Sequence, residues 1–212
     1  MNRAIGSYII KLGKALYHAN LPESTTKTSL IIFSLKAGAK TFSNAQFPIE
    51  EAIEITSQAI KQLNQKSPGH YHFIIDGMTS PYIPEGQKDP EDEPEQRKRF
   101  RESEEHWFGK LREELPGIEL TFINGMNLVE KYPYYKKASK FIRFGTGSYQ
   151  MVWQTLKEST PSNQLAVLVK NSEDERFQLK NRNYATLLPH QNSQDSANRV
   201  IDFIAGDSNP NH

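Results

Sequence analysis

Two polar residues stand directly after apolar runs that have the character of buried strands. Ser34 follows Ile31-Ile32-Phe33, and Asp76 follows Phe73-Ile74-Ile75. In an open parallel sheet, ligands bind beyond the carboxyl ends of the strands, where loops and helix starts converge. A serine at such an end can act as a nucleophile when a neighbouring base removes its proton. Serine also caps helices and closes turns, so both interpretations of Ser34 stay open.

The loop after Ser34 carries groups that suit a phosphate. Lys36, Gly38 and Lys40 supply two positive charges and an unhindered backbone. The stretch lacks the spacing of a P-loop or of a dinucleotide-binding fingerprint. We treat Lys36, Gly38, Lys40 and Asp76 as candidate substrate-binding residues. Asp76 suits a metal, a ribose hydroxyl or an amine, and it also suits the cap of the following turn.

Signatures of metal enzymes and of ordinary hydrolases are absent from the sequence. The histidines show no HExxH spacing, and His70 with His72 would make only an incomplete zinc site on one strand face. No GxSxG elbow is present. The chain has no cysteine, which excludes disulfides and thiolate ligands and favours a reducing compartment. We therefore predict no metal and a cytoplasmic location.

Length and charge narrow the class of protein further. The chain has 212 residues and a formal net charge of +1, so no overall field attracts nucleic acid or a membrane. The apolar stretch over 1–17 is too short and interrupted for a membrane span, and its spacing suits an amphipathic helix. We predict one domain over 1–205, a polar tail over 206–212 and no membrane partner.

The elements that must position Ser34 and Asp76 form a strand, a crossover helix and a second strand. The strand Ser29–Phe33 precedes a helix that opens at Pro48, and Tyr71–Ile75 follows as the next strand. A charged helix from about Glu91 to Leu115 leads to another strand, Ile118–Ile123. The repeated crossover predicts an α/β fold: a Rossmann-like parallel sheet flanked by helices on both faces.

The second half of the chain is less regular. Asn127–Ser159 is rich in aromatic residues and has a helical pattern, which Gly145 and Gly147 split into two helices. Leu165–Val169 suits a strand, with a short buried helix as the alternative. Arg199–Ile204 suits a final helical turn or two.

The charged helix has two interpretations. Asp89–Glu95 is acidic, and four basic residues follow it at once: Arg97, Lys98, Arg99 and Arg101. Opposite charges at i, i+4 spacing, such as Glu95 with Arg99, indicate a solvated helix face. In the second interpretation, the basic residues form a local patch that binds a polyanion.

The order of these features resembles the tRNA-dependent cyclodipeptide synthases. Members of that family carry a catalytic serine after the first strand, in a stretch that ends with an aromatic residue and a serine. Ile31-Ile32-Phe33-Ser34 and Thr41-Phe42-Ser43 are similar to those two ends, and Tyr134-Tyr135 lies in an aromatic segment like the family's middle. The family's basic helix, which grips the tRNA acceptor arm, is matched here by Arg97, Lys98, Arg99, Arg101, Lys110 and Arg112.

The resemblance implies that Ser34 accepts an aminoacyl group from one charged tRNA and that a second aminoacyl-tRNA completes a cyclic dipeptide. It implies no cofactor, neither ATP nor a metal. Tyr184 matches the family's later catalytic tyrosine, but Leu188 stands four residues on, before Pro189, where the family has a glutamate. Where the family has an asparagine after the serine, this chain has either Ala37 or an insertion. Three functions therefore stay open: this aminoacyl transfer, a Rossmann-like nucleotide- or phosphate-binding enzyme, and a non-catalytic binding module with the same fold.

Overall fold

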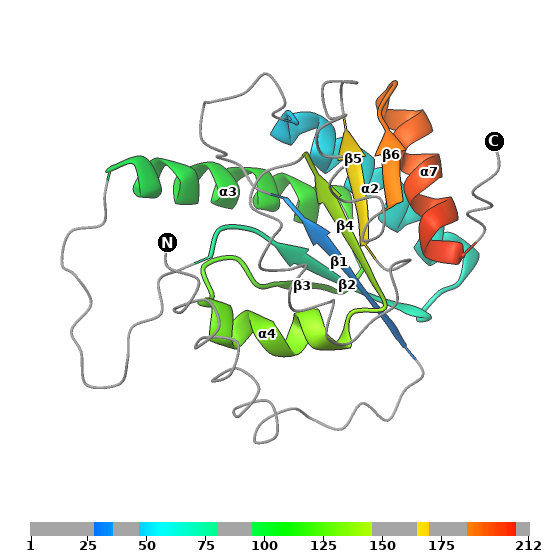
Figure 1. Ribbon diagram of the computed structural model, residues 1–212, viewed down its shortest axis with the longest axis horizontal. Helices are drawn as coiled ribbons and strands as arrows, with labels where there is room; N and C mark the ends of the chain where they lie inside the picture. Colours follow the sequence, from blue (N-terminus) through cyan, green and yellow to red (C-terminus); the bar gives the residue numbers. More distant parts are fainter. Residues whose placement is uncertain (1–27, 36–46, 80–94, 146–164, 170–185, 207–212) are drawn as a thin grey trace.

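A parallel sheet forms the centre of the protein (Figure 1). The computed structural model describes residues 28–35, 47–79, 95–145, 165–169 and 186–206. The strands are β1 (Ser29–Ser34), β2 (Tyr71–Asp76), β3 (Leu120–Phe122), β4 (Lys140–Phe144), β5 (Leu165–Val169) and β6 (Thr186–Pro189). They pair in parallel in the order β3-β2-β1-β4-β5-β6. The predicted α/β class with a Rossmann-like parallel sheet is confirmed.

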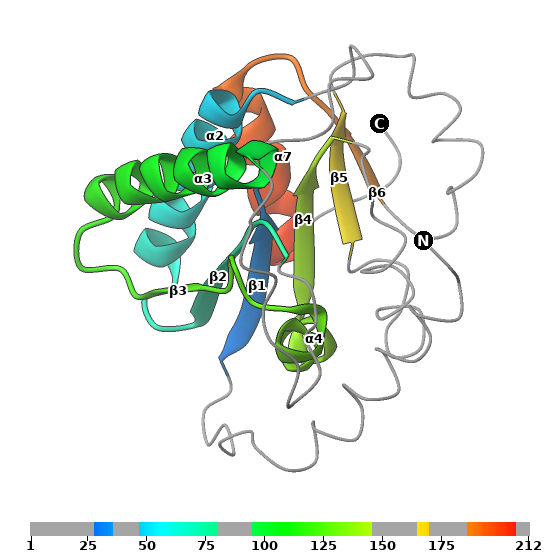
Figure 2. The ribbon, with the colours of Figure 1, turned by 90° about the vertical axis from the view of Figure 1, so that its left-hand side faces the viewer.

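Helices cover both faces of the sheet (Figure 2). On one face lie α2 (Ile49–Lys66), α3 (Glu95–Glu114) and α7 (Ser193–Ala205), and on the other lies α4 (Leu128–Lys137). Alternate strand residues point to opposite faces. Ile31 and Phe33 therefore pack under the three helices, whereas Ile32 packs on the α4 side. Burying a side chain of this size contributes about 1.5–3 kcal/mol, which explains why the strands are apolar on both faces.

The crossover helices begin where the sequence indicates. Pro48 stands directly before α2, and its fixed φ angle suits the start of a helix. The apolar stripe of α2 packs against the sheet, with Ala52, Ile60 and Leu63 among its buried residues. α7 is longer than the predicted turn or two, because the Asn192 side chain accepts a hydrogen bond from Asp195 N–H and caps the helix upstream of Arg199.

The prediction of helix across Asn127–Ser159 is wrong over Lys140–Phe144, which forms strand β4. Phe141 and Ile142 are fully buried against β1 and β5, so both faces of this short segment lie in the sheet. A short apolar run has the same pattern in a buried helix and in a buried strand. Strand β6 was not predicted either, and it occupies the sheet edge beside β5.

Several predictions fall outside the described residues. These include the amphipathic helix over 1–17, the loop over 36–46 and Tyr184. Within the described ranges, no helix combines the length and the apolar character that crossing a bilayer requires.

Candidate functional site

The strand order reverses between β1 and β4, which lie side by side although two strands separate them in sequence. In doubly wound sheets, ligands bind at this switch point, outside the carboxyl ends of the strands. Ser34, the last residue of β1, is in register with Asp76 on β2 and with Arg143 on β4. Residues in register on parallel strands point to the same face. One row of polar side chains therefore crosses the sheet at its switch point.

Both oxygens of the Asp76 carboxylate accept hydrogen bonds from protein groups. Lys131 Nζ donates to Oδ1 at 2.7 Å, while Tyr135 OH and Ser34 Oγ donate to Oδ2 at 3.0 and 3.2 Å. The side chain of Lys131 is fully buried and that of Asp76 nearly so. We call Ser34, Asp76, Lys131 and Tyr135 the Asp76 cluster. Its geometry makes Asp76 an orienting group, because protein donors already occupy both of its oxygens.

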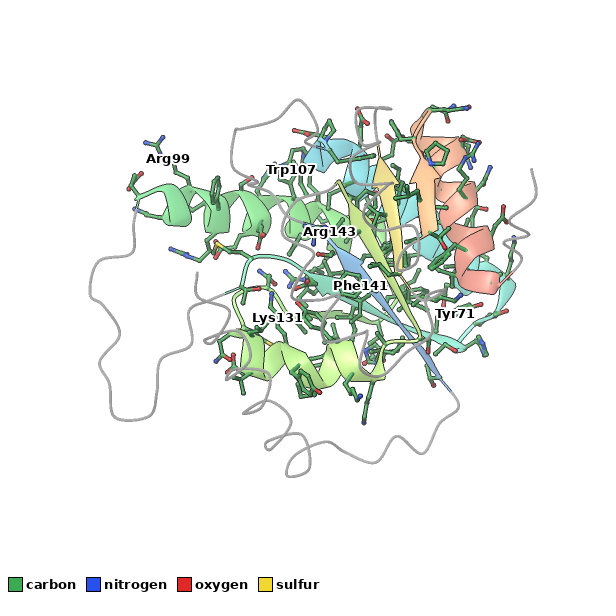
Figure 3. The ribbon with its side chains drawn as sticks, in the orientation of Figure 1. Tyr71, Arg99, Trp107, Lys131, Phe141 and Arg143 are labelled. Carbon is green, nitrogen blue, oxygen red and sulfur yellow. The ribbon has the colours of Figure 1, made fainter. Side chains whose placement is uncertain are left out.

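The phenol of Tyr135 is held in its neutral, donating form. Burial raises the pKa of Tyr135 well above 10.0, the negative charge of Asp76 raises it further, and the charge of Arg143 partly offsets both. Arg143 is in register with Ser34, which places it next to the Asp76 cluster. In Figure 3, Lys131 lies beside α4 and Arg143 lies beside β4.

A capping box sets the start of α4 and thereby aims two members of the cluster. The Asn127 side chain accepts hydrogen bonds from Val129 N–H and Glu130 N–H, and the Glu130 carboxylate accepts from Asn127 N–H. Lys131 and Tyr135 then lie four residues apart on one helix face. That face packs on the sheet, so both side chains reach the end of β2.

The backbone after Asp76 is held from two sides. Lys131 Nζ also lies 3.0–3.1 Å from Gly77 O, Met78 O and Thr79 Oγ1, so at least one of its three N–H groups is shared between two acceptors. From the other face of the sheet, both carboxylate oxygens of Glu104 on α3 accept from Met78 N–H, at 2.7 and 2.8 Å. The strand end that carries Asp76 is therefore rigidly positioned by α3 and α4.

The N-terminus of α2 differs from the helix start that cradles pyrophosphate in dinucleotide-binding folds. Such a helix presents free N–H groups and a partial positive charge to the ligand. Here Glu50 and Glu51 occupy the first turn of α2, and they already complement that charge. An anionic ligand at this edge would therefore depend on cationic side chains such as Arg143.

The structure brings together Ser34 and Asp76, as the sequence predicted, and buries both at 2% and 1% exposure. The candidates Lys36, Gly38, Lys40 and Tyr184 lie outside the described residues. Among the described residues, no group of three His, Asp or Glu side chains is placed to hold a metal ion.

The basic residues assigned to tRNA binding lie on α3, which extends past the edge of the sheet (Figure 1). Lys98, Arg99, Arg101, Lys110 and Arg112 are exposed, and Arg97 lies on the same helix. Arg99 and Arg101 pair with Glu95 and Glu105 one turn away, at 3.2 and 3.3 Å. This is the pairing that the solvated-face interpretation predicts, and tRNA binding stays a prediction.

Sequence reasoning missed Lys131, Arg143 and Glu104 as members of this site. Arg143 carried a usable signal, because a charge inside Phe141-Ile142-Arg143-Phe144 is costly in a core unless it has a role. Lys131 and Glu104 carried none, because lysine and glutamate are common on exposed helix faces and their burial depends on the packing of α4 and α3.

No protein-family model and no curated protein matches this sequence. Solved structures are similar in fold. They include trehalose-phosphate synthases from Burkholderia multivorans (TM-score 0.52) and Burkholderia vietnamiensis (TM-score 0.51), and an E. coli trehalose-6-phosphate structure bound with UDP-2-fluoro glucose (TM-score 0.51). Each is 10% identical and covers 94% of this chain. This chain spans 41–43% of their length, and at this identity the similarity shows the fold alone.

Proposed function

We propose that this protein binds a nucleotide- or phosphate-bearing ligand at the carboxyl edge of the sheet, between β1 and β4. The observation that carries the proposal is the row of Asp76, Ser34 and Arg143 across the switch point. Ligands of doubly wound sheets bind at this location. A structure with a similar fold holds UDP-2-fluoro glucose, which makes nucleotide sugars the first ligands to try.

Arg143 would supply the charge that such a ligand needs. A guanidinium stays protonated at any physiological pH and can hold a phosphate through two parallel hydrogen bonds. Its register position places it beside Ser34, whose hydroxyl is oriented by Asp76. We therefore assign phosphate binding to Arg143 and a ligand contact to Ser34. The acidic first turn of α2 supports this assignment over a helix-bound pyrophosphate.

The test measures ligand stabilisation of the purified protein. Thermal unfolding is followed with UMP, UDP, UDP-glucose, ATP and inorganic phosphate. A ligand present at 100 times its dissociation constant should stabilise the fold by about 2.7 kcal/mol. Arg143→Gln should weaken the binding roughly tenfold or more, because it removes a charge-assisted contact. Arg199→Gln, on α7, is the matched control and should leave the affinity unchanged.

Absence of stabilisation by every compound would contradict the proposal. If Arg143→Gln fails to fold, Arg143→Lys replaces it, because lysine retains the charge but loses the planar, two-pronged geometry. An affinity that is the same in Arg143→Lys and in the wild type would contradict the phosphate-binding role of Arg143.

Aminoacyl transfer through Ser34 is a second candidate. The observation that favours it is the buried hydrogen bond from Ser34 Oγ to Asp76 Oδ2. It orients the hydroxyl, whose oxygen would attack the carbonyl of the aminoacyl ester. The ester bond to the tRNA ribose oxygen would break, and the serine proton would pass by way of Asp76 Oδ2 to that leaving oxygen, which departs as the free tRNA hydroxyl. The resemblance to cyclodipeptide synthases supports the same residue in this role.

Mass spectrometry of culture medium tests this candidate. Cells that express the wild-type chain should release new diketopiperazines, and cells that express Ser34→Ala should release none. Ser29→Ala, at the opposite end of β1, is the control and should retain the products. No product from the wild-type chain would leave nucleotide or phosphate binding as the function to pursue.

A further inference from the structure

Glu104 is a charged residue in a place where charge is costly. It lies on α3, its side chain is buried, and its residue is only 3% exposed. Both carboxylate oxygens are directed at one backbone donor, Met78 N–H. These two contacts, at 2.7 and 2.8 Å, hold Met78 N–H from the α3 side.

Gly77 shows that the chain makes room for this contact. A Cβ added at Gly77 would lie 2.5 Å from Glu104 Oε2 and 2.9 Å from Asn124 Cβ. Real Cβ atoms do not approach other atoms so closely, so any larger residue would displace the carboxylate. The absence of a side chain at position 77 is therefore a requirement of the Glu104 contact.

Lys131 holds the same backbone segment from the other face of the sheet. Lys131 Nζ contacts Gly77 O and Met78 O, the carbonyl oxygens that precede and follow Met78 N–H in the chain, and Glu104 accepts from that N–H. The same ammonium binds Asp76 Oδ1. Gly125 N–H also donates to Met78 O, which ties this segment to the turn that follows β3. Gly77 and Met78 are thus fixed directly next to Asp76.

We propose that Glu104 is a positioning residue for the ligand site between β1 and β4. Its carboxylate fixes the Gly77–Met78 backbone and so holds Asp76 where Asp76 orients Ser34. This inference deepens the proposed function and rests on it for the location of the ligand. Glu104 does not contact the ligand in this arrangement. It acts through Asp76, and its loss changes the direction of the Ser34 hydroxyl more than it changes the fold.

The first arm of the test uses ligand-free protein, so it is independent of the proposed function. The carbon resonances of the Asp76 carboxyl and the Tyr135 phenol are followed by NMR at neutral pH and assigned with Asp76→Asn and Tyr135→Phe. Glu104→Ala should move both resonances and speed exchange of the Met78 amide by roughly tenfold or more. Glu104→Gln retains an acceptor oxygen and should restore most of the wild-type spectrum. Glu102→Ala, exposed on the same helix, is the control.

Gly77→Ala provides an independent perturbation of the same contact. Its Cβ should displace the carboxylate and reproduce the spectrum of Glu104→Ala. If Glu104→Ala fails to fold, Gly77→Ala compared with Glu104→Gln decides the question. Unchanged Asp76 and Tyr135 resonances in Gly77→Ala or in Glu104→Ala would overturn the proposal, because they would show that the cluster is positioned without Glu104.

The second arm measures ligand affinity in the same variants, with the nucleotide that stabilises the wild type most. Glu104→Ala should weaken binding about tenfold, and Glu104→Gln should bind within a few-fold of the wild type. Shifted resonances with unchanged affinity would overturn the link to ligand binding. If no nucleotide binds the wild type, the proposed function fails and the resonances of the first arm still decide the positioning role.

Discussion

Replacement of Lys131 by methionine is the most direct test of the Asp76 cluster. Methionine has a similar length and fills the same apolar space but cannot donate to Asp76, Gly77, Met78 or Thr79. Loss of one partner from a buried ion pair leaves the other charge uncompensated and costs about 3–5 kcal/mol. For a chain of this size, 1 kcal/mol corresponds to roughly 2–4 °C, so the melting temperature should fall by about 6–20 °C.

The assay is urea unfolding followed by circular dichroism, with Lys137→Met as the control on the same helix. Lys137 is exposed, so its replacement should change the free energy of unfolding by less than about 0.5 kcal/mol.

A double-mutant cycle separates the ion pair from general loss of packing. Asp76→Asn removes the charge that Lys131 neutralises, so Lys131→Met should cost less in that background. The two changes should therefore couple by at least about 1 kcal/mol. Strict additivity, or a cost of Lys131→Met below about 1 kcal/mol, would refute the reasoning that this pair positions the end of β2.

Three further predictions follow from named contacts. In an alkaline titration followed by NMR, Tyr135 should ionise above about pH 10, where a free tyrosine ionises. Since its folded pKa is raised, its contribution to stability is fully present below about pH 10 and should be lost as the pH rises above that value; a Tyr135 resonance that titrates at about pH 10 would contradict the burial of its phenol. Phe141→Ala should lower the free energy of unfolding by about 3–5 kcal/mol in urea titrations, because this fully buried ring packs edge-on against Tyr135. A loss below about 1 kcal/mol would contradict this expectation and show that the surrounding side chains close the cavity. Arg99→Gln should change stability by less than about 0.5 kcal/mol in the same assay, because its pair with Glu95 is exposed; a larger loss would mean that α3 depends on its surface ion pairs.

The row of Asp76, Ser34 and Arg143 across the sheet could be predicted in part from the sequence. The continuous apolar runs before Ser34 and Asp76 indicate strands that are buried on both faces, and a crossover between them makes those strands parallel neighbours. Parallel neighbours end at the same sheet edge, so Ser34 and Asp76 had to lie close together. This inference needs only the pattern of the chain and the geometry of a parallel sheet, and the hydrogen bond between the two side chains confirms it.

The partners of that row depend on packing that no local pattern specifies. Arg143 joined it only because Lys140–Phe144 forms a strand, and a short apolar run does not distinguish a buried strand from a buried helix. Lys131 is buried because the capping box at Asn127 fixes where α4 begins and hence which face meets the sheet. Glu104 reaches Met78 because Gly77 leaves space for its carboxylate. The strands and their order of residues are local properties of the sequence, whereas the burial of a charged side chain depends on elements distant in the chain, so only the tertiary structure decided it.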